Sequence, residues 1–116
     1  MEESVTLCAE RDASNALTEM TVSTGWGDTI VFNEGTYYPP LPQSPSRGYD
    51  EYVVVRTENL PLLAGRLGVE GAPIREIFAA VVALAQARAV KRLYDARQLL
   101  DSLGVPYSQD TWIDRD

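Results

Sequence analysis

The side chains best suited to chemistry in this chain are tyrosines and carboxylates flanking a proline-rich segment, TYYPPLPQSPSRGYDEY, at residues 36–52. Tyrosine combines a large apolar ring with a polar hydroxyl, and it is enriched among the residues that dominate protein–protein binding. Carboxylates beside it would complement a basic partner. The pattern therefore predicts a surface that recognises a protein. The predicted partner-binding residues are Trp26, Asp28, Glu34, Tyr37, Tyr38, Tyr49, Asp50 and Glu51. Trp26 and Asp28 belong to the turn GWGD, and they extend this acidic–aromatic surface if that turn lies at the same edge of the fold.

The proline-rich segment itself has three interpretations: a linker, a polyproline ligand or an ordered loop. A linker is disfavoured because neither half of the chain could bury a core alone. The stretch PQSPSR, Pro42 to Arg47, matches the P-x-x-P-x-R pattern of polyproline ligands, but this pattern arises by chance where proline is dense. We therefore expect residues 36–50 to form a long loop whose prolines reduce the entropy lost on binding.

The groups needed for most catalytic and metal sites are missing from the sequence. It has no histidine, and its single cysteine, Cys8, cannot form an intramolecular disulfide. GWGDT lacks the lysine and the spacing of a phosphate-binding loop. Asp50 and Glu51 are adjacent in or near a predicted strand, so they should point to opposite faces and act poorly as a general acid–base pair. We expect no catalytic residue, cofactor or metal site, and a protein that is not an enzyme.

The excess negative charge of the chain lies in the first half of the sequence. The net charge is −7, and residues 1–60 account for all of it with ten acidic and three basic residues. This sign disfavours direct binding to nucleic acid, whose phosphates attract Lys and Arg. It favours a basic partner, which complementary fields steer towards the protein.

The first half of the chain predicts four strands, at residues 4–10, 17–25, 29–35 and 50–57. Alternation places Val5, Leu7 and Ala9 on one face of the first strand, with Cys8 half-buried on the other. Gly35 is expected to end the third strand. Three consecutive valines at 53–55 indicate a central strand covered on both faces.

The second half predicts helices over residues 58–104. Pro61 suits the first turn of one helix, which Gly68 ends. Apolar residues at helical spacing then run from residue 74 to 103, either as one helix or as two that break near Arg88, and Gly104 stops them. The basic residues Arg88, Lys91 and Arg92 are expected to form a solvated face.

These elements predict a single α+β domain over residues 1–116. Residues 1–57 would form an antiparallel sheet of about four strands, covered on one face by two or three helices. Residues 105–116 are too apolar for a frayed end, so they should pack back, as a short edge strand for example. No apolar segment is long enough to cross a bilayer and no secretory signal opens the chain, which favours a cytoplasmic protein without membrane contact.

Two stretches, ENLPLLAGRLG at residues 58–68 and LLDSLGVPYSQDTWID at residues 99–114, resemble segments of small acidic immunity proteins from bacterial polymorphic-toxin and contact-dependent inhibition systems. The resemblance covers about a quarter of the chain. It implies a cytoplasmic protein that binds one cognate toxin domain and blocks its active site or substrate groove without a cofactor. Many such toxins are nucleases with basic grooves.

Three functions are consistent with these features. The first is an immunity protein that neutralises a cognate toxin stoichiometrically. The second is an acidic nucleic-acid mimic that inhibits a defence nuclease. The third is a non-catalytic adaptor subunit of a larger complex.

Overall fold

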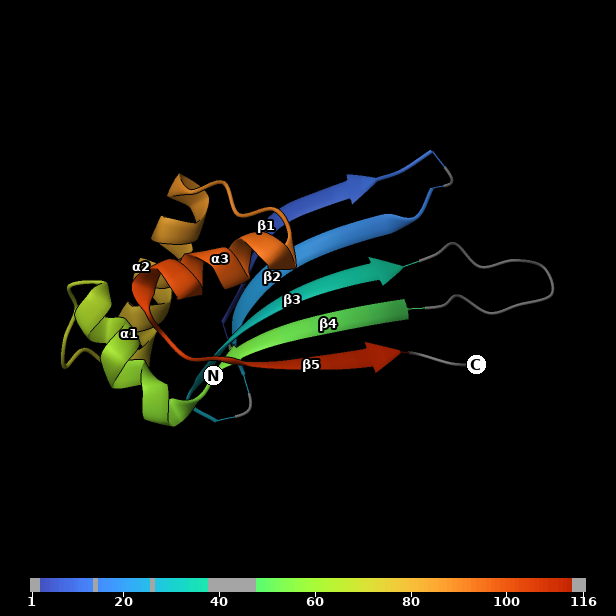
Figure 1. Ribbon diagram of the computed structural model, residues 1–116. Coiled ribbons are helices and arrows are strands. Elements are labelled where there is room, and N and C mark those ends of the chain that lie inside the picture. Colours follow the sequence, from blue (N-terminus) through green and yellow to red (C-terminus); the bar gives the residue numbers. More distant parts are fainter. Residues whose placement is uncertain (1–2, 14, 26, 38–47, 114–116) are drawn as a thin grey trace.

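The computed structural model describes residues 3–13, 15–25, 27–37 and 48–113. Five antiparallel strands form one sheet in the order β1-β2-β3-β4-β5. Three α-helices lie on one face of this sheet (Figure 1). The elements in chain order are β1 (Ser4–Arg11), β2 (Leu17–Gly25), β3 (Thr29–Tyr37), β4 (Gly48–Val55), a 3-10 turn η1 (Thr57–Asn59), α1 (Leu60–Arg66), α2 (Ile74–Ala87), α3 (Leu93–Leu103) and β5 (Ser108–Ile113). This confirms the predicted α+β fold, and the expected edge strand in the tail is the fifth strand.

The core lies between the helices and one half of the sheet. Strand alternation turns Val22, Ile30, Phe32, Val53 and Val55 towards the helices, and each is fully buried. The helices contribute buried apolar residues from all three segments, including Leu63, Phe78, Val81, Ala96 and Leu100. Burial of this shared apolar surface is the main force that holds the helices on the sheet.

The valine run occupies a central strand, as predicted. Val54 points to the face away from the helices, where it pairs with Val31 of β3. These two side chains are 7% and 3% exposed. No described helix lies over this face (Figure 1), yet both side chains are buried there, so the valine run is covered on both faces as predicted, with helices on one of them.

A bulge interrupts the alternation predicted for β1. The register shifts between Thr6 and Cys8, so that Val5 pairs with Val22 and Cys8 pairs with Met20. An extra residue in one strand reverses which face the following side chains take. Val5 and Cys8 therefore both pack against the core, whereas Ala9 is exposed. Cys8 is half-buried, as expected, but on the helix-facing side.

The apolar stretch from residue 74 to 103 forms two helices. Helix α2 ends at Ala87, Ala89 adopts a left-handed φ of 52°, and α3 begins at Leu93. The Asp95 carboxylate accepts hydrogen bonds from the backbone N–H groups of Lys91 and Arg92, which caps the new helix. Gly104, at a φ of 69°, ends α3 as the sequence predicts. No helix in the described part of the chain is long and apolar enough to cross a membrane.

The helices cover only one end of the sheet, and the other end extends beyond them (Figure 1). The reason is visible along β3, where the helix-facing positions change from Ile30 and Phe32 to Glu34 and Thr36. The matching positions on β4 change from Val53 to Glu51 and Tyr49. Polar side chains at these positions give a helix no apolar surface to cover.

The predicted loop at residues 36–50 is shorter than expected. Strand β3 continues past Gly35 to Tyr37, and β4 begins at Gly48. Thr36 pairs with Tyr49 and Tyr37 with Gly48, while β2 pairs with the other side of β3 over the same length. Backbone pairing on both sides therefore outweighs the low strand propensity of glycine. Residues 38–47, including Pro42 and the rest of PQSPSR, lie outside the described residues.

Candidate functional site

The antiparallel register separates the predicted partner-binding residues into three places. Trp26 and Tyr38 lie outside the described residues. Asp28 lies in the turn between β2 and β3, and its carbonyl accepts a hydrogen bond of 2.8 Å from the Thr57 hydroxyl. Tyr37 is at the other end of β3, roughly 27 Å away at the usual rise per strand residue. Asp28 and Tyr37 therefore do not share an edge, and the expectation that the GWGD turn joins the tyrosine surface is wrong.

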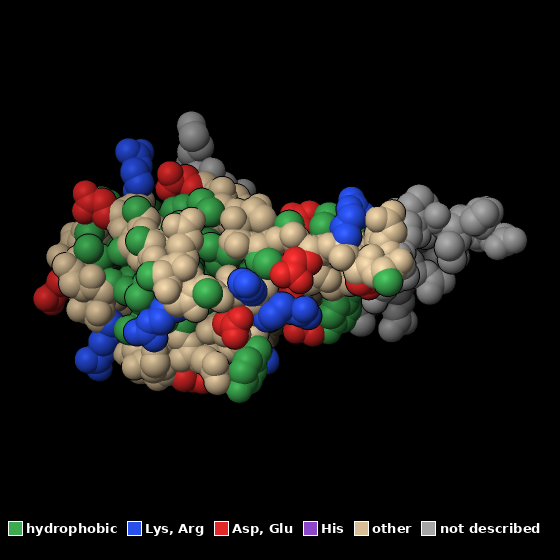
Figure 2. Space-filling view, turned by 90° about the horizontal axis from the view of Figure 1, so that it is seen from above, with side chains coloured by type: hydrophobic (Ala, Val, Ile, Leu, Met, Phe, Trp, Pro, Cys, Tyr) green, Lys and Arg blue, Asp and Glu red, His purple; other side chains and the backbone are tan. Residues whose placement is uncertain are grey.

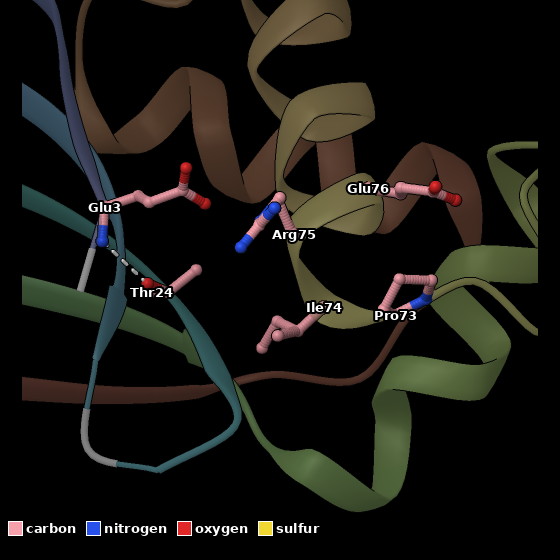
Figure 3. A pocket seen from close by; sticks show the side chains of 6 residues that line it. All are labelled: Glu3, Thr24, Pro73, Ile74, Arg75 and Glu76. Carbon is pink, nitrogen blue, oxygen red and sulfur yellow. Dashed lines mark hydrogen bonds between the residues drawn. The ribbon is translucent and has the colours of Figure 1, made fainter. Parts of the chain in front are cut away.

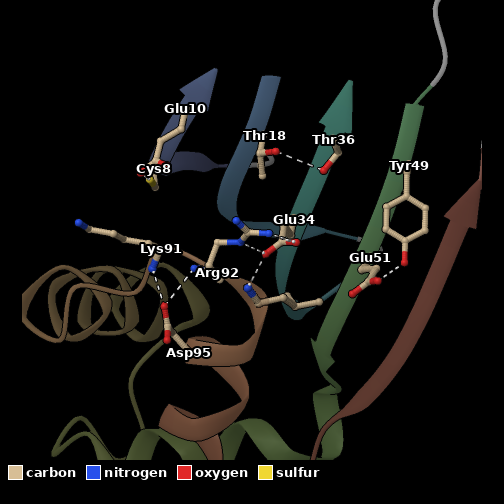
Figure 4. Close-up of polar contacts among 11 residues, drawn as sticks. Cys8, Glu10, Thr18, Glu34, Thr36, Tyr49, Glu51, Lys91, Arg92 and Asp95 are labelled. Atoms are coloured by element: carbon tan, nitrogen blue, oxygen red, sulfur yellow. Dashed lines mark hydrogen bonds and ion pairs between the residues drawn. The ribbon is translucent and has the colours of Figure 1, made fainter. Parts of the chain in front are cut away.

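Glu34 lies on the helix-facing side of the sheet, where it holds the start of α3 (Figure 4). Its Oε1 accepts hydrogen bonds of 2.9 Å from both Arg92 Nε and the Leu93 backbone N–H. The Glu34 side chain is 14% exposed, and that of Arg92 is 60% exposed. A carboxylate at a helix N-terminus is favoured by the helix dipole and by the unpaired N–H groups there. This arrangement favours a structural role for Glu34, and it places Arg92 in an ion pair and not on a wholly solvated basic face.

Tyr49 and Glu51 share the helix-facing side further along the sheet. The Tyr49 hydroxyl donates a hydrogen bond to the Glu51 carboxylate (Figure 4). This bond to an anionic acceptor, together with some burial, raises the pKa of Tyr49. Beside them the hydroxyls of Thr18 and Thr36 lie 3.4 Å apart. This side is thus polar, with its carboxylates in contact with neighbouring groups.

Tyr37 and Asp50 lie together on the opposite, outer side of the sheet. The Tyr37 hydroxyl donates a hydrogen bond of 3.0 Å to Asp50 Oδ1, and Asn33 Nδ2 donates to the same oxygen at 3.3 Å. The Tyr37 side chain lies over Gly35, where a Cβ atom would be only 2.5 Å from the Tyr37 hydroxyl and 2.6 Å from Asp50 Oδ1. Gly35 is therefore needed for close approach of the tyrosine to the sheet. Asp50 and Glu51 point to opposite faces, as predicted.

Three further residues complete this side. Glu19 pairs with Gly35, and Tyr52 pairs with Asn33 on one side and Asp110 on the other. We call the six residues together the outer sheet surface: Glu19, Asn33, Tyr37, Asp50, Tyr52 and Asp110. Glu19 and Asp110 were missed as site residues in the sequence because they come from strands remote in the chain. Alternation alone does group Asp50 with Tyr52, two residues apart on one strand.

The electrostatics of this surface are unfavourable for a further negative charge. Burial, the Asp50 hydrogen bond and the Asp50 and Glu19 charges raise the pKa of Tyr37 to about 12. Burial, followed by the charges of Asp50 and Asp110, raises the pKa of Tyr52. Three carboxylates thus act on two tyrosines that the strands hold in place. The surface is suited to contact a cation.

A hollow lies elsewhere, at the start of α2. It has a volume of about 550 Å³. Its lining residues are Glu3, Thr24, Pro73, Ile74, Arg75 and Glu76. Figure 3 shows Arg75 and Glu3 pointing towards each other, with Glu76 directed away. Because both acidic and basic side chains line this hollow, its charge does not favour a cation or an anion. The outer sheet surface, with three carboxylates, favours a cation.

Among the described residues no group of three or more Cys, Asp and Glu side chains is placed to hold a metal ion. Figure 2 shows acidic and basic side chains interspersed on the side of the molecule seen from above.

Comparison with known proteins finds no relative. No protein family, curated protein or solved structure matches this chain.

The raised pKa of Tyr37 predicts a distinct step in an alkaline titration. The Tyr37 phenolate should form near pH 12, and Tyr37→Phe should remove its contribution from the near-ultraviolet absorbance. Because the pKa is raised above its ordinary value of about 10, the fold favours the neutral phenol. The stability due to Tyr37 is therefore complete below pH of about 10 and is lost as the pH rises towards about 12.

Two further variants separate the causes of this shift. Asp50→Asn should lower the Tyr37 pKa only in part, because burial, the largest cause, remains. Gly35→Ala should lower it further, because the added methyl group displaces the tyrosine from the sheet. Tyr94→Phe removes the hydroxyl of an exposed tyrosine of α3 and should leave the Tyr37 step unchanged. If Tyr37 in the unmodified protein instead ionises at the ordinary tyrosine pKa of about 10, the contact between Tyr37 and Asp50 is contradicted.

Proposed function

We propose that the protein is an immunity protein that binds a cognate toxin domain and neutralises it by stoichiometric inhibition. The observation that carries the proposal is the charge of the sheet. Its five strands contain six acidic residues and one basic residue, Arg11. The acidic residues are Glu10, Glu19, Glu34, Asp50, Glu51 and Asp110. A toxin with a basic groove would meet complementary charge at this sheet.

The end of the sheet beyond the helices supports this proposal. Its side chains are tyrosines, threonines and carboxylates held by strand pairing, so little order has to be gained on binding. Tyrosine supplies contact area and the carboxylates supply the sign of the field. The helical region differs, because residues 56–107 contain seven basic and five acidic residues. The molecule is therefore polarised, which would orient a basic partner towards the sheet as it approaches.

Co-expression tests the function directly. The toxic C-terminal domain encoded by a neighbouring gene would be expressed in cells with and without this protein. We expect growth to be restored, and the two proteins to co-elute in a 1:1 complex. Toxicity that persists despite expression of folded protein would contradict the proposal. Displacement of the complex by duplex DNA would be explained by a shared basic groove, whereas binding to a host defence nuclease alone would indicate the nucleic-acid mimic instead.

Charge reversal tests the mechanism of binding. The double variant Glu19→Lys, Asp110→Lys should slow association with the toxin domain by about tenfold or more at low salt, and the difference should shrink as salt is added. Glu58→Lys, Glu70→Lys makes the same change in net charge away from the sheet and is the matched control. Stopped-flow association rates measure both. Equal slowing by the two double variants would show that only net charge matters.

A further inference from the structure

We infer that the outer sheet surface is the face that binds the partner, and that one arginine or lysine side chain of the partner enters a hollow beside Tyr52. This inference rests on the proposed function, because it names the face and the anchor residue of the same binding event. It begins from the difference between the two sides of the sheet. On the helix-facing side, the Glu34 carboxylate accepts hydrogen bonds from Arg92 and Leu93, and the Glu51 carboxylate accepts one from the Tyr49 hydroxyl. On the outer side, no described helix lies over the strands (Figure 1).

The hollow results from a change in side-chain size between neighbouring strands. Thr21 and Ser23 on β2 are small, whereas Tyr52 on β4 is large, and Val31 of β3 lies between them. The hollow is open to solvent and has a volume of about 180 Å³. This is several times the share of liquid volume that one water molecule occupies, about 30 Å³. The hollow therefore has room for one long side chain and not for a helix.

The lining of the hollow matches both parts of a basic side chain. Val31 offers a nearly buried apolar floor, and the Tyr52 ring forms one wall. The methylene stem of an arginine or lysine can lie against such surfaces while its charged head remains at the rim. An aromatic wall also attracts a cation through the negative face of its ring.

The charges at the rim select the head group. Asp50 accepts a hydrogen bond from Asn33, which lines the hollow, and Asp110 pairs with Tyr52 from the next strand, on the other side of the ring. Asn33 donates one hydrogen bond to Asp50 Oδ1 and another, of 3.2 Å, to the Glu51 carbonyl, which fixes this edge of the hollow. A guanidinium or ammonium at this edge would gain charge-assisted hydrogen bonds.

The same charges disfavour other occupants. An acidic side chain or a nucleic-acid phosphate would be repelled by the carboxylates of the outer sheet surface. A second copy of this chain would present the same three carboxylates to them, so self-association through this face is disfavoured. A neutral apolar side chain could pack against Val31, but it would form no ion pair with the carboxylates near Tyr52. A basic segment of a partner protein is the occupant that fits both the floor and the rim.

The test uses the whole protein and a defined probe, the peptide acetyl-Gly-Arg-Gly-amide, followed by NMR of the isotope-labelled chain. We expect saturable shifts of the backbone amides of Ser23, Val31 and Tyr52, with a millimolar Kd. The matched peptide with norleucine in place of arginine should bind about tenfold more weakly, the change that about 1.4 kcal/mol produces. Shifts centred on Thr18, Thr36 and Thr111, equal binding of both peptides, or no saturable shift would each overturn the inference.

Two aromatic substitutions locate the site. Ser23→Phe fills the hollow without a change of charge. It should raise the Kd of the arginine peptide by about tenfold or more. Thr111→Phe places the same ring on the helix-facing side of β5 and should leave the affinity unchanged. The co-expression experiment separates this inference from the proposed function. If the Ser23→Phe protein is folded and protects cells as well as the unmodified protein, the function stands and the inference fails. If the unmodified protein gives no protection, the function fails, and the peptide titration alone decides whether the hollow binds arginine.

Discussion

Replacing Phe32 with alanine is expected to lower the free energy of unfolding by about 3–5 kcal/mol. Phe32 is fully buried where β3 meets the helices. Its removal would lose the apolar contacts of the ring and leave a cavity that the neighbouring strands and helices fill only in part. Since domains are stable by only about 5–15 kcal/mol, this loss would be a large share of the total free energy of unfolding. Urea unfolding followed by circular dichroism measures the change.

The matched comparison is Tyr37→Ala on the same strand. Tyr37 is 40% exposed, and its main specific contact is the hydrogen bond to Asp50. Its removal should lower the free energy of unfolding by only about 1–1.5 kcal/mol, close to the net value of one hydrogen bond. The contrast between two aromatic residues five positions apart tests whether the core ends where the helices end. A loss at Tyr37 as large as that at Phe32 would mean that the far end of the sheet contributes to the core.

Replacing Glu34 with alanine is expected to lower the free energy of unfolding by about 1–3 kcal/mol. The change removes the acceptor for the Leu93 N–H and leaves the Arg92 guanidinium without its partner. The first helical N–H groups have no partner within the helix, so a lost acceptor at this position is costly when the site is partly shielded from water. The helix α3 should open before the rest of the fold. Hydrogen exchange of the Leu93 amide, compared with the global free energy from urea, measures this.

Three variants serve as controls for Glu34. Glu51→Ala removes the neighbouring carboxylate on the same face, which bonds to Tyr49 and not to a helix, so its effect on α3 should be small. Glu34→Gln keeps an oxygen acceptor but loses the charge, and it should fall between the unmodified protein and Glu34→Ala. Arg92→Ala should lower the free energy of unfolding by less than about 1 kcal/mol, because that side chain is largely exposed. Equal losses for Glu34→Ala and Arg92→Ala would mean that the ion pair, and not the bond to Leu93, matters.

Two regions show how far the sequence could predict the fold. The strands were recognisable from period-2 alternation and the helices from apolar residues at helical spacing, with Gly104 as a stop, because these signals are local. The bulge in β1 was not recognisable, since Leu7 fits the alternation equally well without it. For a similar reason the sequence does not distinguish one helix from two over residues 74–103. Residues 88–92 are compatible with a helix. In the folded protein, hydrogen bonds made by Arg92, Leu93 and Asp95 stabilise the start of a separate helix, α3.

The candidate site was predicted in composition but not in arrangement. The amino-acid sequence alone establishes the excess of acidic residues and the α+β order of elements, because these depend on residue types and local spacing. It also establishes that Asp50 and Glu51 face opposite ways, since side chains alternate along any strand. Which residues of different strands share a face depends on how the folded chain pairs them. Strand register joins Glu19, Tyr37, Tyr52 and Asp110 from four strands, directs Glu34 into the fold and sends Asp28 to the opposite end. Alternation along one strand gives the face of a side chain but not its partner on the neighbouring strand, which depends on the register of the pairing.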